Sequence, residues 1–294
     1  MNVLDYGNYN NEKIVIALGY FDSIHSGHQM LLKETINLSK ELNALSAVLL
    51  FTGNFKGEKD VFTLEERLIK IKALKIDRVI SKRVNKEFIE TNAQDFLDQL
   101  LSLYNVEGIV VGEDFTFGFK KLGNIHLLNY VCKEKGIVLK VLPLKTDENG
   151  EKVSSTKIKQ LLNEGNVEKI NTLLDSNYFI RGYVEKGREL GRKIGFPTAN
   201  MSLSKDKYPL KEGVYYTCTY INGNLYEGIT NVGPQPTFNS DKYIVETYIK
   251  NFNGDLYNKY LTIYFISRIR DIKTFNSVEE LKEQLQKDEK WLKW

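Results

Sequence analysis

The stretch KIVIALGYFDSIHSGHQMLL (13–32) decides the fold class of the amino-terminal half of this chain. It begins with a short apolar run that ends in glycine and an aromatic residue, as a buried strand does, and it leads into a helical pattern over 28–43. Further strand-like runs lie at 46–51, 77–81, 108–112 and 136–144, and further helical patterns lie at 63–74 and 93–104. Strands that alternate with helices predict a parallel sheet covered on both faces.

A different pattern begins near residue 178. Short aromatic and β-branched runs, separated by Gly, Asn and Pro, occupy 181–187, 213–223, 225–233, 244–252 and 260–270. Asn222 and Gly223 between two of these runs are a strong signal for a β-hairpin. Regularly spaced short strands predict an antiparallel barrel or sandwich, and 277–294 predicts a closing helix. We therefore expect two domains, 1–177 and 178–294, with the boundary after a helical segment at 157–174.

The composition is that of an ordinary globular protein. The chain has 294 residues, of which 42% are hydrophobic, and its 41 Lys and Arg against 38 Asp and Glu leave a net charge of only +3. So small a charge argues against a nucleic-acid-binding protein. Cys132 and Cys218 are too few for a disulfide framework and fit a reducing compartment. No run approaches the roughly 20 apolar residues that span a membrane, so we expect a cytoplasmic protein.

Two of the three histidines, His25 and His28, lie between the first predicted strand and its helix. A helix amino terminus offers unpaired N–H groups and partial positive charge, and imidazoles there can donate to phosphoryl oxygens. Gly27 would let the backbone approach a phosphate closely. On spacing alone three interpretations stay open: phosphate chemistry, structural histidines, and half of a zinc site that no cysteine pair accompanies.

The second half contains GRELGRKIGFPTAN (187–200), a segment rich in glycine. Glycines let a loop wrap around phosphate, although a barrel connection has the same composition. Thr198 and Asn200 lie two residues apart, so an extended chain turns both to one side, where they could coordinate Mg²⁺ or hold a nucleotide. Glu246 lies among apolar and aromatic neighbours in a predicted strand, where an acid needs either solvent or a function.

These motifs resemble those of the bacterial bifunctional riboflavin kinase/FAD synthetase family. GYFDSIHSGHQMLL (19–32) is similar to its G-x-F-D-G-x-H-x-G-H motif, a form of the HxGH signature of nucleotidyltransferases. VVGEDFTFG (110–118) and VSSTKIKQLLNEGNVE (153–168) are similar to two further motifs, and G-F-P-T-A-N at 195–200 is a specific mark of riboflavin kinases. The resemblance implies a Rossmann-like nucleotidyltransferase domain followed by an antiparallel β-barrel with a terminal helix.

The resemblance also implies two activities. In the second domain, Glu246 is the general base that takes the proton from the 5′-hydroxyl of riboflavin, which attacks the γ-phosphorus of ATP and gives FMN. In the first domain, the FMN phosphate attacks the α-phosphorus of ATP, giving FAD and pyrophosphate, while His25 and His28 contact the phosphates. Mg²⁺ offsets the charge on the triphosphate.

The remaining site residues are implied by the same resemblance. Those for ATP or phosphate are Gly19, Phe21, Gly27, Ser155, Thr156, Gly187, Arg192, Gly195 and Pro197. Those for the flavin are Asp114, Phe115, Asn231, Thr237, Arg270 and Phe275, and those for Mg²⁺ are Thr198 and Asn200. We expect riboflavin, FMN, FAD and ATP as substrates or products, and neither a nucleic acid nor a membrane as a partner.

The chain departs from the family pattern at a few positions. Ser23 replaces a glycine, Lys157 and Lys159 replace arginines and so lose bidentate geometry, and Asn258 stands where glycine is usual. Residues 51–55 read FTGNF where the family has F-D-P-H-P. Two alternatives to the bifunctional enzyme therefore stay open. One is a riboflavin kinase with a degenerate adenylyltransferase domain, and the other is a flavin-binding regulator without turnover, against which the intact P-T-A-N segment argues.

Overall fold

The computed structural model describes residues 1–8, 10–53, 57–187, 195–237 and 240–293. The chain divides into two compact units, Met1–Lys59 with Leu64–Ser154, and Asp60–Thr63 with Ser155–Trp294. The short segment Asp60–Thr63 thus leaves the first unit and belongs to the second. The domain boundary that we expect at 177/178 stays a prediction.

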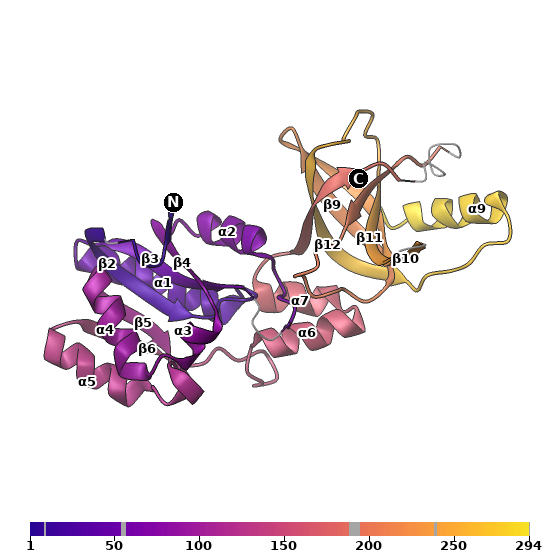
Figure 1. Cartoon of the computed structure of the whole chain (residues 1–294). Helices are drawn as coiled ribbons and strands as arrows, with labels where there is room; N and C mark the ends of the chain where they lie inside the picture. Colours follow the sequence, from indigo (N-terminus) through magenta and orange to yellow (C-terminus); the bar gives the residue numbers. More distant parts are fainter. Residues whose placement is uncertain (9, 54–56, 188–194, 238–239, 294) are drawn as a thin grey trace. The chain divides into compact units, whose positions relative to one another are not determined.

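The first unit is built on a sheet that has six parallel strands among the described residues, in the order β1-β4-β3-β2-β5-β6 (Figure 1). The strands are β1 (Asn2–Asp5), β2 (Asn10–Gly19), β3 (Leu45–Thr52), β4 (Arg78–Arg83), β5 (Tyr104–Gly112) and β6 (Val138–Leu142). From β2 the chain adds β3 and β4 on one side, and it then returns to add β5 and β6 on the other. The predicted parallel sheet is confirmed, with β1 as an additional short edge strand.

Helices cover both faces of this sheet. They are α1 (Ser26–Glu41), α2 (Leu64–Ala73), α3 (Lys86–Glu90), α4 (Ala93–Leu103) and α5 (Ile125–Lys135), with a 3₁₀ turn at Phe119–Lys121. Val15 and Ala17 of β2 pack in one core with α1 and α2, while Ile14 and Ile16 pack in the other with α4 and α5. Burial of both faces explains why the β2 sequence is a nearly continuous apolar run.

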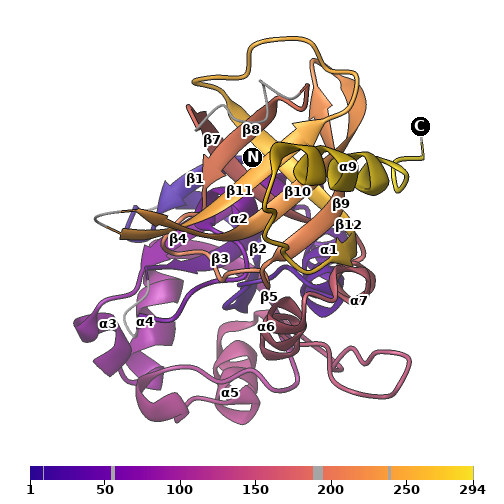
Figure 2. The same ribbon diagram turned by 90° about the vertical axis from the view of Figure 1, so that its right-hand side faces the viewer.

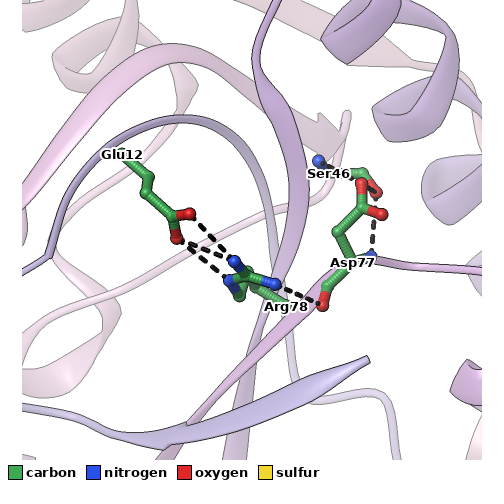
Figure 3. Close-up of polar contacts among 4 residues, drawn as sticks. All are labelled: Glu12, Ser46, Asp77 and Arg78. Atoms are coloured by element: carbon green, nitrogen blue, oxygen red, sulfur yellow. Dashed lines mark hydrogen bonds and ion pairs between the residues drawn. The ribbon is translucent and has the colours of Figure 1, made fainter.

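Polar contacts hold the amino-terminal ends of the central strands (Figure 3). The Asp77 carboxylate accepts hydrogen bonds from the backbone N–H of Ser46 at 3.0 Å and from its hydroxyl at 2.7 Å. The Arg78 guanidinium donates to both carboxylate oxygens of Glu12 at 2.9 Å. Because Ser46 is buried, its hydroxyl needs a protein partner, and Asp77 supplies it. The Asp77 contacts tie β3 to the start of β4, and the Arg78–Glu12 pair ties β4 to the start of β2.

The second unit is a closed antiparallel barrel whose strand order is β10-β11-β8-β7-β12-β9. The strands are β7 (Tyr178–Glu185), β8 (Thr198–Ser202), β9 (Gly213–Ile221), β10 (Asn224–Thr237), β11 (Ser240–Ile249) and β12 (Tyr260–Arg270). Asn222 and Gly223 form the two-residue hairpin between β9 and β10, with φ of 51° and 83°. Positive φ at both positions is what a type I′ turn requires, so the predicted hairpin is confirmed. The closed strand order confirms the predicted antiparallel barrel.

Three helices accompany the barrel in the described part of this unit, α6 (Ser155–Glu164), α7 (Val167–Leu174) and α9 (Val278–Glu289). Figure 2 shows α9 lying across the outside of the barrel. The segment that follows it places Leu292 in an apolar cluster with Val214, Tyr216 and Ile229. The Ser277 hydroxyl caps α9 by accepting the backbone N–H of Glu280 at 3.1 Å. None of the helices in the described ranges combines the length and the apolar character needed to cross a membrane.

A buried lysine attaches the segment Asp60–Thr63 to the barrel. Lys207 is 1% exposed, and its Nζ donates to the carbonyl of Val61 at 3.0 Å. The same Nζ lies 4.7 Å from the ring centroid of Phe62 and 4.8 Å from that of Tyr178. A desolvated ammonium that faces two adjacent rings, whose centroids are 5.5 Å apart, is stabilised by cation–π attraction, so four residues far from the barrel in sequence become part of its structure.

Candidate active sites

His25 and His28 stand together at the start of α1, where β2 ends. His25 is the N-cap of the helix, and its Nδ1 accepts the backbone N–H of His28 at 3.2 Å. The two imidazole rings stack with centroids 3.7 Å apart, and the Phe21 ring lies 5.1 Å from that of His28. A Cβ on Gly27 would lie 3.1 Å from Cε1 of His25, so glycine permits this close packing. The histidines, Phe21 and Gly27 are therefore neighbours, and His25 also has the capping role that spacing alone left open.

Both histidines are neutral at pH 7. Burial, assisted by the nearby Lys152 charge, lowers the pKa of His25 to about 4. Burial, the neighbouring His25 and Lys152 hold the pKa of His28 well below its ordinary value. Because Nδ1 of His25 accepts a hydrogen bond, the proton of its neutral ring is on Nε2, which is then a donor. Nδ1 of His28 is buried without a hydrogen-bond partner among the described residues.

Asp114 and Lys152 complete the polar surroundings of the histidines. Asp114 follows β5, the strand next to β2 on the side opposite β3, and Lys152 Nζ lies 2.5 Å from its Oδ2. The chain leaves β2 and β5 toward opposite sides of the sheet, so the carboxyl ends of these strands form a topological switch point, the place where open α/β sheets bind ligands. Sequence reasoning missed Lys152, although it is the basic residue directly before V-S-S-T.

The other residues predicted for the first site have different surroundings. Gly19 ends β2, and a Cβ there would lie 3.1 Å from the Phe21 ring. Phe115 stacks on Phe117 with centroids 5.4 Å apart and packs against the core formed with α4 and α5. Ser155 and Thr156 open α6, as predicted, and belong to the second compact unit. Their predicted phosphate contacts, like the flavin contact of Phe115, stay predictions.

In the second unit, Thr198 and Glu246 lie on neighbouring strands of the barrel wall. Glu246 on β11 pairs in register with Asn200 on β8 and with Asn231 on β10. The Thr198 hydroxyl donates to Oε1 of Glu246 at 2.7 Å, and Nδ2 of Asn200 lies 3.3 Å from the same hydroxyl oxygen. Thr198 and Asn200 thus turn to one side of β8, as their spacing predicts, and a carboxylate 48 residues away joins them.

A cavity of about 450 Å³ opens beside these residues. Its lining includes Thr198, Asn200, Gly187 and Pro197, together with the loop 252–257. A Cβ on Gly187 would lie only 2.6 Å from Nδ2 of Asn200, so any side chain at this position would displace the Asn200 amide. The cavity therefore places four predicted nucleotide or metal residues around one space of the size that small ligands occupy.

Asn258 and Gly195, two positions within the motifs of this unit, have left-handed backbone conformations. Asn258 has φ of 62°, a left-handed conformation that asparagine tolerates better than most side chains, which accounts for its replacing the usual glycine. Gly195 has φ of 88° and is exposed. Arg192, predicted to contact phosphate, lies outside the described residues.

The donor set beside the cavity suits Mg²⁺. Across the described parts of the chain, no three His, Cys, Asp or Glu side chains gather in a way that would hold a metal ion. Thr198 and Asn200 instead offer a hydroxyl and an amide oxygen next to the Glu246 carboxylate. Mg²⁺ prefers oxygen ligands and keeps several waters or substrate phosphates, so one or two protein ligands are enough.

The residues predicted for the flavin are spread along the barrel and its last connection. Asn231 is exposed on β10 beside Glu246 in register, and Phe275 is half-buried before α9. The Arg270 guanidinium is bound by the Asp288 carboxylate, with Nη2 at 2.6 Å from Oδ2. For Thr237 only the backbone position at the end of β10 is described. Contact of these residues with flavin stays a prediction.

Two protein families match the chain. Residues 8–157 match FAD synthetase, and residues 174–293 match riboflavin kinase. A Bacillus subtilis (strain 168) protein described as bifunctional riboflavin kinase/FMN adenylyltransferase is 34% identical over 287 residues, which cover 94% of this chain and 90% of that protein. A protein of the same description from Buchnera aphidicola subsp. Schizaphis graminum is 33% identical over 291 residues, covering 95% and 92%.

A solved structure is similar over nearly the whole chain. It is a crystal structure from Streptococcus pneumoniae described as a macrolide-efflux protein, with a TM-score of 0.88 and 30% identity. The match covers 98% of this chain and 97% of that one. The likeness in sequence and structure thus includes both the histidine site and the barrel site.

Proposed function

This chain belongs to the family of bifunctional riboflavin kinase/FMN adenylyltransferases, and from that premise we propose that it phosphorylates riboflavin to FMN and adenylylates FMN to FAD, using ATP for both. One structural observation supports two activities rather than one. Each compact unit holds its own polar cluster, with His25 and His28 in the first and Thr198 and Glu246 in the second. The kinase reaction uses the second unit and does not need the histidine cluster of the first.

In the kinase reaction, Glu246 accepts the proton of the riboflavin 5′-hydroxyl as the hydroxyl oxygen attacks the γ-phosphorus of ATP. The bond from the γ-phosphorus to the bridging oxygen breaks, ADP leaves and FMN forms. The hydrogen bond from Thr198 holds one carboxylate oxygen in place, which leaves the other oxygen to act as the base. Gly187 lets its loop lie close to Asn200 at the cavity. Thr198 and Asn200 would hold Mg²⁺, which when bound offsets the negative charge of the phosphates.

In the adenylyltransferase reaction, the FMN phosphate attacks the α-phosphorus of ATP and pyrophosphate leaves. Nε2–H of His25 and the amino terminus of α1 donate to phosphoryl oxygens, and Lys152 adds a positive charge. Because both histidines are neutral, each ring has one N–H to donate and adds no positive charge. No covalent intermediate on the protein is needed, since the reaction depends on positioning and on stabilisation of developing charge.

A time course with riboflavin, ATP and Mg²⁺ tests this proposal. We expect FMN to form first and FAD to follow, with release of pyrophosphate. FMN without FAD would identify a kinase whose first domain lacks activity, and unchanged riboflavin would identify a flavin-binding protein without turnover. Supplying FMN directly separates the second reaction from the first.

Two pairs of variants assign the sites. Glu246→Gln should lower FMN formation by about 10²–10⁴-fold and spare the adenylylation of supplied FMN, while Glu283→Gln, an exposed change on α9, should do neither. His28→Asn should lower adenylylation by about 10²–10³-fold and spare the kinase, with His126→Asn on the exposed face of α5 as control. Near-normal FMN production by Glu246→Gln would refute its role as the base.

We also propose a cytoplasmic location and small molecules as the only substrates. The cysteine chemistry supports a reducing compartment, because Cys132 and Cys218 are both free thiols. Burial raises the pKa of each thiol to about 11, so neither is a ready nucleophile at neutral pH.

A further inference from the structure

Tyr248 connects three parts of the second unit next to the Thr198–Glu246 pair. It lies two residues after Glu246 on β11 and pairs in register with Thr198 on β8. Its ring meets that of Phe196 edge-on, with centroids 5.0 Å apart and planes inclined by 62°. Its hydroxyl donates to Oε1 of Glu289 on α9 at 3.0 Å. Tyr248 therefore lies on the strand of the proposed base, and its side chain contacts both the segment before Thr198 and the terminal helix.

Helix α9 itself stands apart from the reacting groups. Among the described residues, those that line the cavity all precede the helix, and the last of them is Tyr257. The helix is nevertheless firmly attached to the barrel, because Asp288 binds Arg270, and the backbone N–H of Lys293 donates to Glu227 at 2.7 Å. Any influence of α9 on the site must therefore pass through a residue that contacts both.

We propose that Tyr248 is a positioning residue of the kinase site, which couples the docking of α9 to the placement of Thr198 beside Glu246. The coupling passes through Phe196, because Pro197 restricts the backbone between Phe196 and Thr198. When Glu289 accepts the hydrogen bond from the Tyr248 hydroxyl, the Tyr248 ring is fixed against the Phe196 ring. The backbone from Phe196 to Thr198 then has one position, and so does the Thr198 hydroxyl at the start of β8. This inference rests on the proposed kinase function.

Variants of both partners of the hydrogen bond test the inference. Tyr248→Phe keeps the ring and removes the hydroxyl, and Glu289→Ala removes the acceptor. We expect each to lower kcat/KM for ATP in FMN formation by about tenfold and to leave KM for riboflavin within about twofold, because the displaced group is Thr198. Glu289→Gln keeps an oxygen acceptor and should restore near-normal kinetics.

Three further measurements separate positioning from simple stabilisation. The double variant Tyr248→Phe/Glu289→Ala should lose no more activity than either single variant, since both remove the same contact. Adenylylation of supplied FMN should be unchanged in every variant, because it uses the first unit. Tyr220→Phe removes an exposed hydroxyl from β9 and serves as the matched control.

The inference fails if Tyr248→Phe stays within about twofold of the wild type in kcat/KM for ATP, or if the losses of the two single variants multiply in the double variant. If the wild type makes no FMN, the proposed function fails instead. The inference is then decided by the Kd for ADP with Mg²⁺, which Tyr248→Phe should raise by about tenfold. An unchanged Kd would overturn it.

Discussion

Removing the Asp288 carboxylate should detach α9 while the barrel stays folded. Asp288 is 2% exposed and accepts hydrogen bonds from Arg270 Nε at 3.0 Å, from Arg270 Nη2 at 2.6 Å and from Gln284 Nε2 at 2.8 Å. Asp288→Ala therefore leaves the Arg270 guanidinium, only 15% exposed, without its counter-ion. It also leaves the Gln284 amide without this acceptor.

The magnitude follows from the burial of the pair. Removing one partner of a buried ion pair costs about 3–5 kcal/mol, because the other charge stays desolvated. Arg270 keeps the hydrogen bond from Nη1 to the carbonyl of Asp271 at 3.0 Å and some access to water, which reduces the cost. We expect a loss of about 2–4 kcal/mol in the attachment of α9. Arg270→Met with Asp288→Leu removes both charges and should recover most of it.

The positions of the tryptophans provide the assay. The chain has two, Trp291 and Trp294, and both follow α9. Tryptophan fluorescence during urea unfolding therefore reports the end of α9, whereas circular dichroism reports both units. In Asp288→Ala the midpoint of the fluorescence transition should move to a lower urea concentration. It should then separate from the transition of the barrel, which circular dichroism follows. Glu279→Ala, an exposed change in the first turn of α9, is the control.

Coincident and unmoved transitions in Asp288→Ala would refute this reasoning. A shift of less than about 0.5 kcal/mol is what surface substitutions produce, and it would mean that the ion pair does not attach the helix. The kinase rate of the same variant should fall together with that of Tyr248→Phe, because both weaken the link between α9 and β11.

Three further outcomes are expected. Burial lowers the folded-state pKa of His25 to about 4 against 6.5 when unfolded, so its contribution to stability is full above pH 6.5 and should fall by roughly 2–3 kcal/mol near pH ~4.5. His25→Asn keeps a capping oxygen but has no imidazole to titrate. Its free energy of unfolding, measured with urea, should therefore fall less between the two pH values than that of the wild type, and equal falls would contradict the linkage. Gly187→Ala should displace Asn200, since its Cβ would lie 2.6 Å from Nδ2, and raise KM for ATP by about tenfold; wild-type kinetics would contradict this. Asp77→Ala removes the acceptor of the buried Ser46 hydroxyl and should lower the free energy of unfolding by about 1–3 kcal/mol, so an unmoved urea midpoint would count against the contact.

Much of the fold was predictable, because the apolar patterns of strands and helices are visible within short segments of the sequence. The run 13–21 and its neighbours alternate between strand and helix patterns, and the parallel sheet follows from that alternation. Four elements escaped prediction, namely the helices α3 and α5 and the strands β1 and β8. Of the two strands, β1 has only four residues, and β8 lies in a segment whose Gly and Pro are typical of a loop. For β8, pairing with β11 overrides the local composition, so it is a strand only because of its neighbours.

The sequence by itself determined the alternation of strands and helices in the first half, the series of short strands in the second, the two histidines at a helix start, the two-residue hairpin and the family of the protein. Only the tertiary structure decided which distant residues meet. Glu246 accepts from Thr198 across 48 residues, Lys152 pairs with Asp114, and Asp288 binds Arg270. The physical reason is that periodicity and turn chemistry act between near neighbours in the chain. Contacts across strands depend instead on register and closure, which the whole barrel or sheet sets at once.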